Sequence, residues 1–119
     1  MTKRSAEAFI AVATFFAAVT GCSADEVGLG DPTGSECPID STLTWQTFGQ
    51  VFIEDNCARC HDSEGPRIVT QADVRANLDL IDRAAAAGPD ATNTYMPEDR
   101  ELSTTERKNL GEWLACGAP

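Results

Sequence analysis

The chain has 119 residues, enough for one domain, and it is strongly acidic, with 9 lysines and arginines against 19 aspartates and glutamates and a formal net charge of −10. Phosphate binding requires clustered basic side chains, so this balance excludes nucleic acid as a partner. A protein or membrane partner would have to present a basic face.

The N-terminal end has the pattern of an export signal. Lys3 and Arg4 form a short basic end, and residues 8–19 form an apolar stretch that is too short to span a bilayer well. The alternative, a buried N-terminal helix of the domain, fits these flanking residues less well. Export places the protein in an oxidising compartment, which changes how its cysteines are interpreted.

The stretch VTGC, residues 19–22, resembles the lipobox of bacterial lipoproteins, in which the cysteine is lipid-modified and becomes the new N-terminus. The resemblance implies a signal peptide over residues 1–21 and a lipid anchor on Cys22. The following residues are rich in glycine and aspartate, with few large apolar side chains. We therefore predict a flexible tether over residues 22–36 and a folded unit over residues 37–119.

Three segments of the folded unit have helical periodicity. In the first, over residues 44–55, the aromatic side chains of Trp45, Phe48 and Phe52 fall on one face. This amphipathic helix runs directly into Cys57.

The second and third predicted helices begin at capping-box patterns. One starts at Thr70 and continues at helical spacing until Gly88-Pro89 stops it, and the other starts at Ser103 and continues toward Cys116. No run alternates polar and apolar residues as a strand does. The sequence therefore predicts an all-α domain of three helices joined by long loops.

The sequence NCARCHDSEG, residues 56–65, contains Cys57 and Cys60 with two residues between them, and His61 directly after. Each position of this C-x-x-C-H pattern has a chemical reason. Two thiols add across the vinyl groups of haem, and the adjacent histidine is carried beneath the ring to bind iron as the proximal ligand. We predict one covalently attached haem c per chain.

Two other chemistries use paired cysteines. A thioredoxin-like redox dithiol follows a strand in a βαβ unit, whereas this pair follows a predicted helix. A structural zinc site needs four ligands, and the cysteine spacing leaves that alternative open. The candidate zinc ligands are Cys37, Cys57, Cys60 and Cys116, with His61 in place of one of them.

The second axial ligand of a haem would have to come from a short list of residues. His61 is the only histidine, so a bis-histidine haem cannot form within one chain. Met96 is the only methionine after the initiator, and its polar surroundings favour iron ligation over gap-filling in the core. Tyr95 and Lys108 are weaker candidates.

The order of these parts over residues 43–116 resembles a small class I, mono-haem c-type cytochrome. The resemblance implies a cytochrome c-like fold with Met96 as the distal ligand, in which the first and last helices cross beside the haem and their apolar stripes meet. The acidic loop after His61 departs from the larger members of that family. The residues of the two stripes are Trp45, Phe48 and Phe52 in the first helix and Leu110, Trp113 and Leu114 in the last.

If those helices pack together, Cys37 and Cys116 are brought close enough for a disulfide, with two unpaired thiols as the alternative. The five cysteines would then divide into one for lipid, two for haem and two for the disulfide.

The predicted function is a membrane-tethered electron carrier of the bacterial periplasm or cell surface. It would exchange single electrons with redox proteins that carry a basic docking face. An enzyme is disfavoured, because the chain has no spare histidine for distal acid-base chemistry. The alternatives are a haem-based sensor or small-ligand-binding module, and a non-haem lipoprotein closed by zinc or disulfides.

Overall fold

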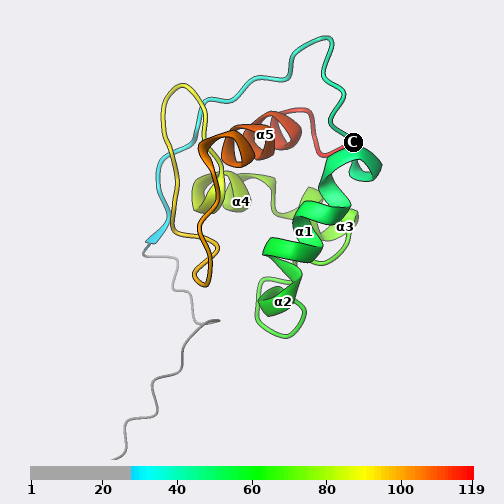
Figure 1. The fold of residues 1–119 in the computed structure, drawn as a ribbon, viewed down its shortest axis with the longest axis vertical. Coiled ribbons are helices and arrows are strands. Elements are labelled where there is room, and N and C mark those ends of the chain that lie inside the picture. Colours follow the sequence, from blue (N-terminus) through cyan, green and yellow to red (C-terminus); the bar gives the residue numbers. More distant parts are fainter. Residues whose placement is uncertain (1–27) are drawn as a thin grey trace, which may run out of the picture.

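The computed structural model describes residues 28–119, so the predicted signal peptide, the predicted lipidation site Cys22 and the first part of the predicted tether lie outside the described residues. The described residues form five α-helices and no strand, which confirms the all-α prediction for this part of the chain (Figure 1). None of these helices is long and apolar enough to cross a membrane. In chain order the helical elements are the π-helical turn η2 (Trp45–Gly49), α1 (Gln50–Asn56), α2 (Ala58–His61), α3 (Gln71–Ala76), α4 (Leu78–Ala85) and α5 (Thr104–Ala115).

The first predicted helix is present as η2 and α1. Thr44 caps its start, because its hydroxyl accepts the Thr47 N–H at 3.1 Å while the Thr47 hydroxyl accepts the Thr44 N–H at 2.8 Å. Cys57 leaves the regular helix and separates α1 from the single turn α2.

The second predicted helix is split into α3 and α4. Its capping box is confirmed, since the Thr70 hydroxyl accepts the Asp73 N–H at 3.2 Å and the Asp73 carboxylate accepts the Thr70 N–H at 2.8 Å. The prediction of one continuous helix as far as Gly88 is wrong. Asn77 leaves the helical conformation, with φ −130° and ψ 26°, while its Nδ2 donates to the Asp73 carbonyl at 2.8 Å. A short amide side chain that bonds nearby backbone competes with the helix in this way.

The third predicted helix is confirmed as α5, with Ser103 as its cap. Trp113 of α5 is fully buried, and its ring centroid lies 6.2 Å from that of Trp45 and 5.7 Å from that of Phe48. A Cβ at Gly49 would overlap the Trp113 ring, so this approach of ring to backbone needs a glycine. The first and last predicted helices therefore meet through their aromatic stripes.

The hydrophobic core lies where α1, α3, α4 and α5 converge. Each of these four helices contributes at least one of the best-buried large side chains, so the core depends on all four helices packing together. These side chains are Ile53, Val74, Ile81, Leu110 and Trp113.

The predicted flexible tether is wrong for residues 28–36. Thr33 is fully buried, and its N–H and hydroxyl donate to the two carboxylate oxygens of Asp82 at 2.8 Å and 2.6 Å. The Gly30 N–H donates to the Arg83 carbonyl at 2.8 Å, and Arg83 Nε donates to the Gly30 carbonyl at 2.9 Å. The polar groups of this segment are thus paired with α4 rather than with water, so the segment belongs to the folded unit.

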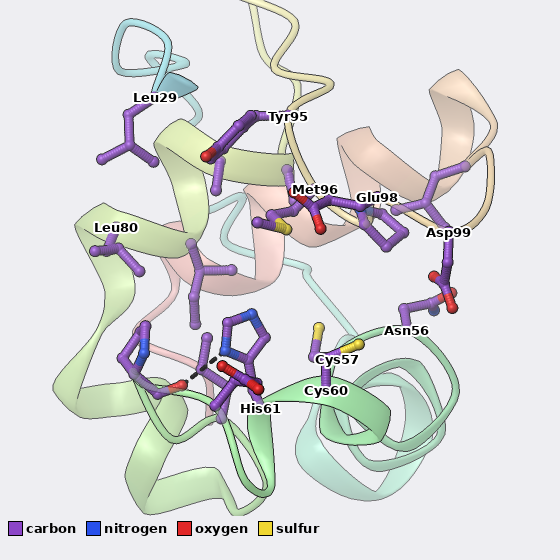
Figure 2. Close-up of a pocket in the computed structure, with 18 of the residues that line it drawn as sticks. Leu29, Asn56, Cys57, Cys60, His61, Leu80, Tyr95, Met96, Glu98 and Asp99 are labelled. Atoms are coloured by element: carbon purple, nitrogen blue, oxygen red, sulfur yellow. Dashed lines mark hydrogen bonds between the residues drawn. The ribbon is translucent and has the colours of Figure 1, made fainter. Parts of the chain in front are cut away.

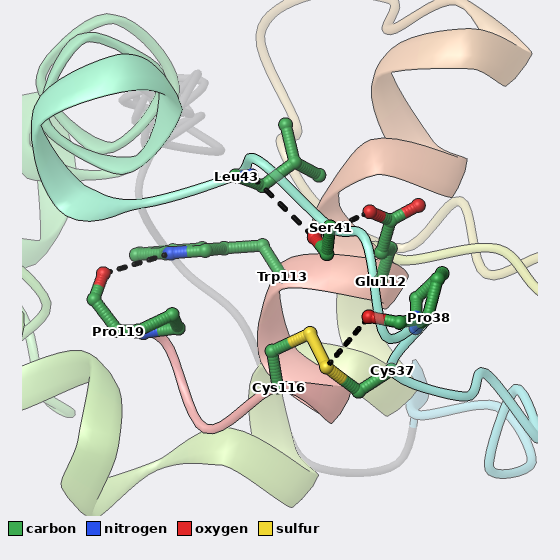
Figure 3. The surroundings of a disulfide bond; sticks show 8 residues. All are labelled: Cys37, Pro38, Ser41, Leu43, Glu112, Trp113, Cys116 and Pro119. Atoms are coloured by element: carbon green, nitrogen blue, oxygen red, sulfur yellow. Dashed lines mark hydrogen bonds between the residues drawn. A yellow bond between two sulfur atoms is a disulfide. The ribbon is translucent and has the colours of Figure 1, made fainter.

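Cys37, the predicted start of the folded unit, is joined to Cys116 by a disulfide, with the two Cα atoms 4.7 Å apart (Figure 3). The bond spans a sequence separation of 79 residues. Closing such a loop lowers the conformational entropy of the unfolded chain and so stabilises the fold by about 4 kcal/mol. Beside it, the Ser41 hydroxyl donates to the Glu112 carboxylate at 2.6 Å. The Pro119 carbonyl accepts the first N–H of η2 at 2.6 Å, so the C-terminal end is held against the start of the first helix.

Candidate functional site

The cysteine–histidine motif lies on a single helical turn. The His61 N–H donates to the Cys57 carbonyl at 2.9 Å and closes α2. Cys57, Cys60 and His61 therefore occupy positions i, i+3 and i+4, which lie on the same face of a helix. Figure 2 shows both sulfur atoms and the imidazole at one wall of a cavity.

The loop that follows His61 fixes its imidazole. Nδ1 lies 2.8 Å from the Pro66 carbonyl oxygen (Figure 2). Because a carbonyl oxygen only accepts, Nδ1 donates to it, and in the neutral imidazole this tautomer places the lone pair on Nε2. The Ile68 N–H also donates to the His61 carbonyl at 3.2 Å, which holds the loop against α2. Metal-binding histidines commonly have their second ring nitrogen bonded to a backbone carbonyl, and here Nε2 is the atom left for a metal.

The cavity beside the motif has a volume of about 330 Å³, within the range of about 300–1,000 Å³ that is usual for small-molecule sites. Its lining is mainly apolar, with exposed carboxylates of Glu64, Glu98 and Asp99 among the remaining residues. Such a cavity suits an apolar ligand whose charged groups reach water. The buried apolar side chains that line it are Phe52, Ile68, Ile81, Ala84, Ala85 and Leu102.

Met96 lies across the same cavity from His61 (Figure 2). Its N–H donates to the Ala84 carbonyl of α4 at 2.9 Å. Further along the segment, the Asp99 carboxylate forms an ion pair with Arg59 of α2 at 2.9 Å. The structure thus brings the four predicted haem-binding residues to one cavity from two distant parts of the chain.

A buried arginine that the sequence analysis did not single out contacts the backbone of the Met96 segment. Arg107 of α5 is 3% exposed. Its Nη1 lies 2.8 Å from the carbonyl oxygens of Ala85 and Asn93 and 2.9 Å from that of Met96. Burial lowers the pKa of the Arg107 guanidinium from its ordinary value, and nearby carboxylates oppose that lowering.

The segment predicted to be a tether also contributes to the cavity. Leu29 lines it next to Tyr95 (Figure 2). The buried amide of Asn93 joins this segment to α4, since its Nδ2 donates to the carbonyl oxygens of Asp31 and Asp82, both at 2.9 Å. The polar composition of residues 28–36 gave no signal of this role.

The cysteines of the described residues are in different states. Cys57 is a free thiol, and burial raises its pKa to about 12, so its sulfur is protonated at neutral pH. A redox dithiol needs the opposite shift in pKa, which disfavours that alternative. Cys60 is disulfide-bonded, so a thioether at Cys60 requires its thiol to be released by reduction first.

The zinc alternative loses three of its five candidate ligands, because Cys60 is disulfide-bonded as well as Cys37 and Cys116. Cys37 and Cys116 are bonded to each other, so neither is a thiolate in this structure. Within residues 28–119 no group of three or more histidine, cysteine, aspartate or glutamate side chains is placed to hold a metal ion.

Comparison of the chain with protein-family models, with curated proteins and with solved structures gives no match. The interpretation therefore rests on the residues of the cavity. They fit a covalently bound haem in their chemistry: two cysteine sulfurs and an imidazole with a free Nε2 at one wall, a thioether across from them, and an apolar lining between.

Proposed function

We propose that the protein is a mono-haem c-type cytochrome that transfers single electrons, with a cytochrome c-like fold around one covalently bound haem c. The observation that carries the proposal is the single cavity lined by Cys57, Cys60, His61 and Met96. Cys57 and Cys60 would hold the group through thioether bonds, and His61 Nε2 and Met96 Sδ would bind its iron. Bound there, the haem supplies a one-electron couple between ferric and ferrous iron.

The chain's own contribution is to bind, orient and shield the group. The Pro66 carbonyl holds the His61 ring with Nε2 free. The apolar lining, from residues such as Ile81 and Leu102, keeps water from most of the cavity, and a thioether ligand stabilises the ferrous state. These features support a carrier of electrons rather than a catalyst of bond formation.

The same proposal includes the setting in which the carrier works. A lipid on Cys22 would tether the domain to a membrane in the bacterial periplasm or at the cell surface. The formal net charge of −10 favours redox partners with a basic docking face, because opposite charge steers the encounter.

The test is an absorption spectrum of the full-length chain, produced in a bacterial host that attaches haem c and measured in its oxidised and reduced states. We expect haem that stays with the denatured chain, and a weak long-wavelength band in the ferric state from iron bound to methionine sulfur. Met96→Ala should abolish that band and leave the haem attached. Tyr95→Phe is the matched control, because Tyr95 lines the same cavity and its variant should keep the band.

Two other outcomes of this measurement would argue against an electron carrier. Covalent haem without the band in the native chain would favour a sensor or small-ligand-binding module. Haem that is absent after production in that host would overturn the cytochrome proposal.

A further inference from the structure

We propose that Arg107 is the positioning residue for Met96: its guanidinium fixes the backbone that presents the Met96 thioether to the cavity. This inference rests on the proposed function, in which Met96 binds the haem iron. Arg107 itself would touch neither iron nor haem, since its bonds run to backbone carbonyls.

The contacts of Arg107 join three separate points of the chain. Nη1 reaches the carbonyl oxygens of Ala85, Asn93 and Met96 at 2.8, 2.8 and 2.9 Å. Ala85 is the last residue of α4, so its carbonyl has no partner within the helix, and a cation at that end also suits the helix dipole. Nη1 has two hydrogens for three acceptors, so at least one hydrogen is shared. One side chain therefore fastens the end of α4 to both ends of the segment that leads to Met96.

The backbone of Met96 is held from both sides. Its N–H donates to the Ala84 carbonyl of α4 at 2.9 Å, and its carbonyl accepts from Arg107 of α5. A methionine side chain has three rotatable bonds and adapts easily, so the position of its sulfur depends on how firmly its backbone is placed. If the carbonyl is released, the thioether samples positions away from the cavity.

The identity of the side chain matters to this role. Arg107 is buried in a site of backbone carbonyls, and its planar, delocalised guanidinium directs donors into that site. A lysine ammonium is a compact, strongly hydrated charge that would bring fewer directed donors to the same three oxygens. Arg107→Lys keeps the charge and most of the stem, so it separates the hydrogen-bond geometry from the charge itself.

The experiment compares full-length Arg107→Lys and Arg107→Gln with the native chain, each as purified. The first measurement is the long-wavelength ferric band, which we expect to be weakened in Arg107→Lys and lost in Arg107→Gln while the haem stays attached. The second is amide hydrogen exchange at Met96, which we expect to be about 10- to 100-fold faster in the variants. This exchange is measurable whether or not the chain carries haem.

Val74→Ala is the matched control. Val74 is fully buried in α3 and is not among the residues that line the cavity, so its truncation lowers stability without removing a cavity-lining side chain or a hydrogen bond of the Met96 backbone. It should keep the ferric band. Loss of the band in Val74→Ala to the same extent as in the Arg107 variants would reduce Arg107 to a general structural role and overturn the proposal.

The remaining outcomes separate the two proposals. An unchanged band together with unchanged Met96 exchange in both Arg107 variants would overturn the role of Arg107 and leave the cytochrome proposal intact. A native chain without haem would overturn the cytochrome proposal, and the exchange measurement would then show only whether Arg107 holds the segment. If Arg107→Gln does not fold, Arg107→Lys alone decides between these results.

Discussion

The two walls of the cavity are built in different ways. The wall with His61 is local: a single helical turn places Cys57, Cys60 and His61 together, and the Pro66 carbonyl orients the imidazole from five residues away. The wall with Met96 depends on partners that are distant in sequence, including Arg107 of α5. One half of the site therefore follows from a short motif, whereas the other half exists only once the helices have packed.

This difference predicts different local stabilities. Segments held by long-range contacts open when those contacts break, whereas the hydrogen bonds of α2 join residues only three or four apart. We therefore expect the Met96 segment to exchange its amide hydrogens faster than the residues around His61.

The largest expected effect comes from the side chain that joins α5 to η2, the start of the helix that leads to the His61 wall. Trp113 of α5 is fully buried and packs against Trp45 and Phe48. Trp113→Ala should lower the free energy of unfolding by about 3–5 kcal/mol, through lost burial and the cavity left behind. Denaturant unfolding measures the loss, and both walls should unfold in one transition.

Val51→Ala is the control, because Val51 is 63% exposed and its truncation should have little effect. A Trp113→Ala variant with two separated transitions, one for each wall, would contradict the view that α5 unites them.

A pair of asparagines tests the difference between long-range and local support. Asn93 donates to the carbonyls of Asp31 and Asp82, and Asn93→Ala leaves both without that donor, at a cost of about 1–3 kcal/mol. Asn56 donates to the Phe52 carbonyl within its own helix, and its Oδ1 is buried without a partner among the described residues. Removing Asn56 also removes that unpaired acceptor, so Asn56→Ala should cost less than about 1 kcal/mol. Thermal unfolding measures the loss of stability in the two variants, and equal losses would contradict the expected difference between long-range and local support.

The sequence predicted the local features of the molecule well. The starts of the helices at Thr70 and Ser103 follow from capping boxes that involve residues three apart, and both are present. The aromatic contact of Trp45 with Trp113 followed from the implied crossing of the first and last helices.

Most of the features that the sequence did not predict depend on distant partners. Thr33 stands in a polar, glycine-rich segment, and only the folded chain brings Asp82 within reach of its hydroxyl. Arg107 lies in a highly polar stretch, although its position three residues before the buried Leu110 places it on the core-facing side of α5. A charged residue on such a face is the signal that could have identified it. The break at Asn77 was missed because asparagine ends helices only in some contexts.

A smaller effect concerns the acidic caps, one beside each wall. The Asp73 carboxylate accepts the N–H groups of Thr70 and Val69 in the loop after His61, and these bonds, the one from Thr70 most of all, lower its pKa. The Glu106 carboxylate accepts the Ser103 N–H at the start of α5, and that bond likewise lowers its pKa. A carboxyl whose pKa is lower in the folded state stabilises the fold above its unfolded pKa, about 4, and loses that contribution as the pH falls toward the folded value.

Asp73→Asn and Glu106→Gln should therefore each reduce the fall in unfolding free energy between about pH 5 and pH 3. Thermal unfolding across that range measures the change. Thr44→Ala is the control, since the capping box of η2 contains no carboxylate and its loss, about 1 kcal/mol, should be the same at every pH. A Glu106→Gln variant with the native pH profile would show that its cap does not persist in solution.

The smallest expected effect belongs to the ion pair of Arg59 with Asp99, which runs directly from one wall of the cavity to the other. Arg59 of α2 lies 2.9 Å from Asp99, and their side chains are 59% and 27% exposed, so solvent screens the attraction. A double-mutant cycle with Arg59→Gln and Asp99→Asn should give a coupling of less than about 1 kcal/mol, and added salt should reduce it further. A coupling well above that value would mean that a surface bond, rather than Arg107 and the packing of α5, sets the position of the Met96 segment. The distance between the walls would then depend on ionic strength, and so would the ferric band expected from the proposed bond between Met96 and iron.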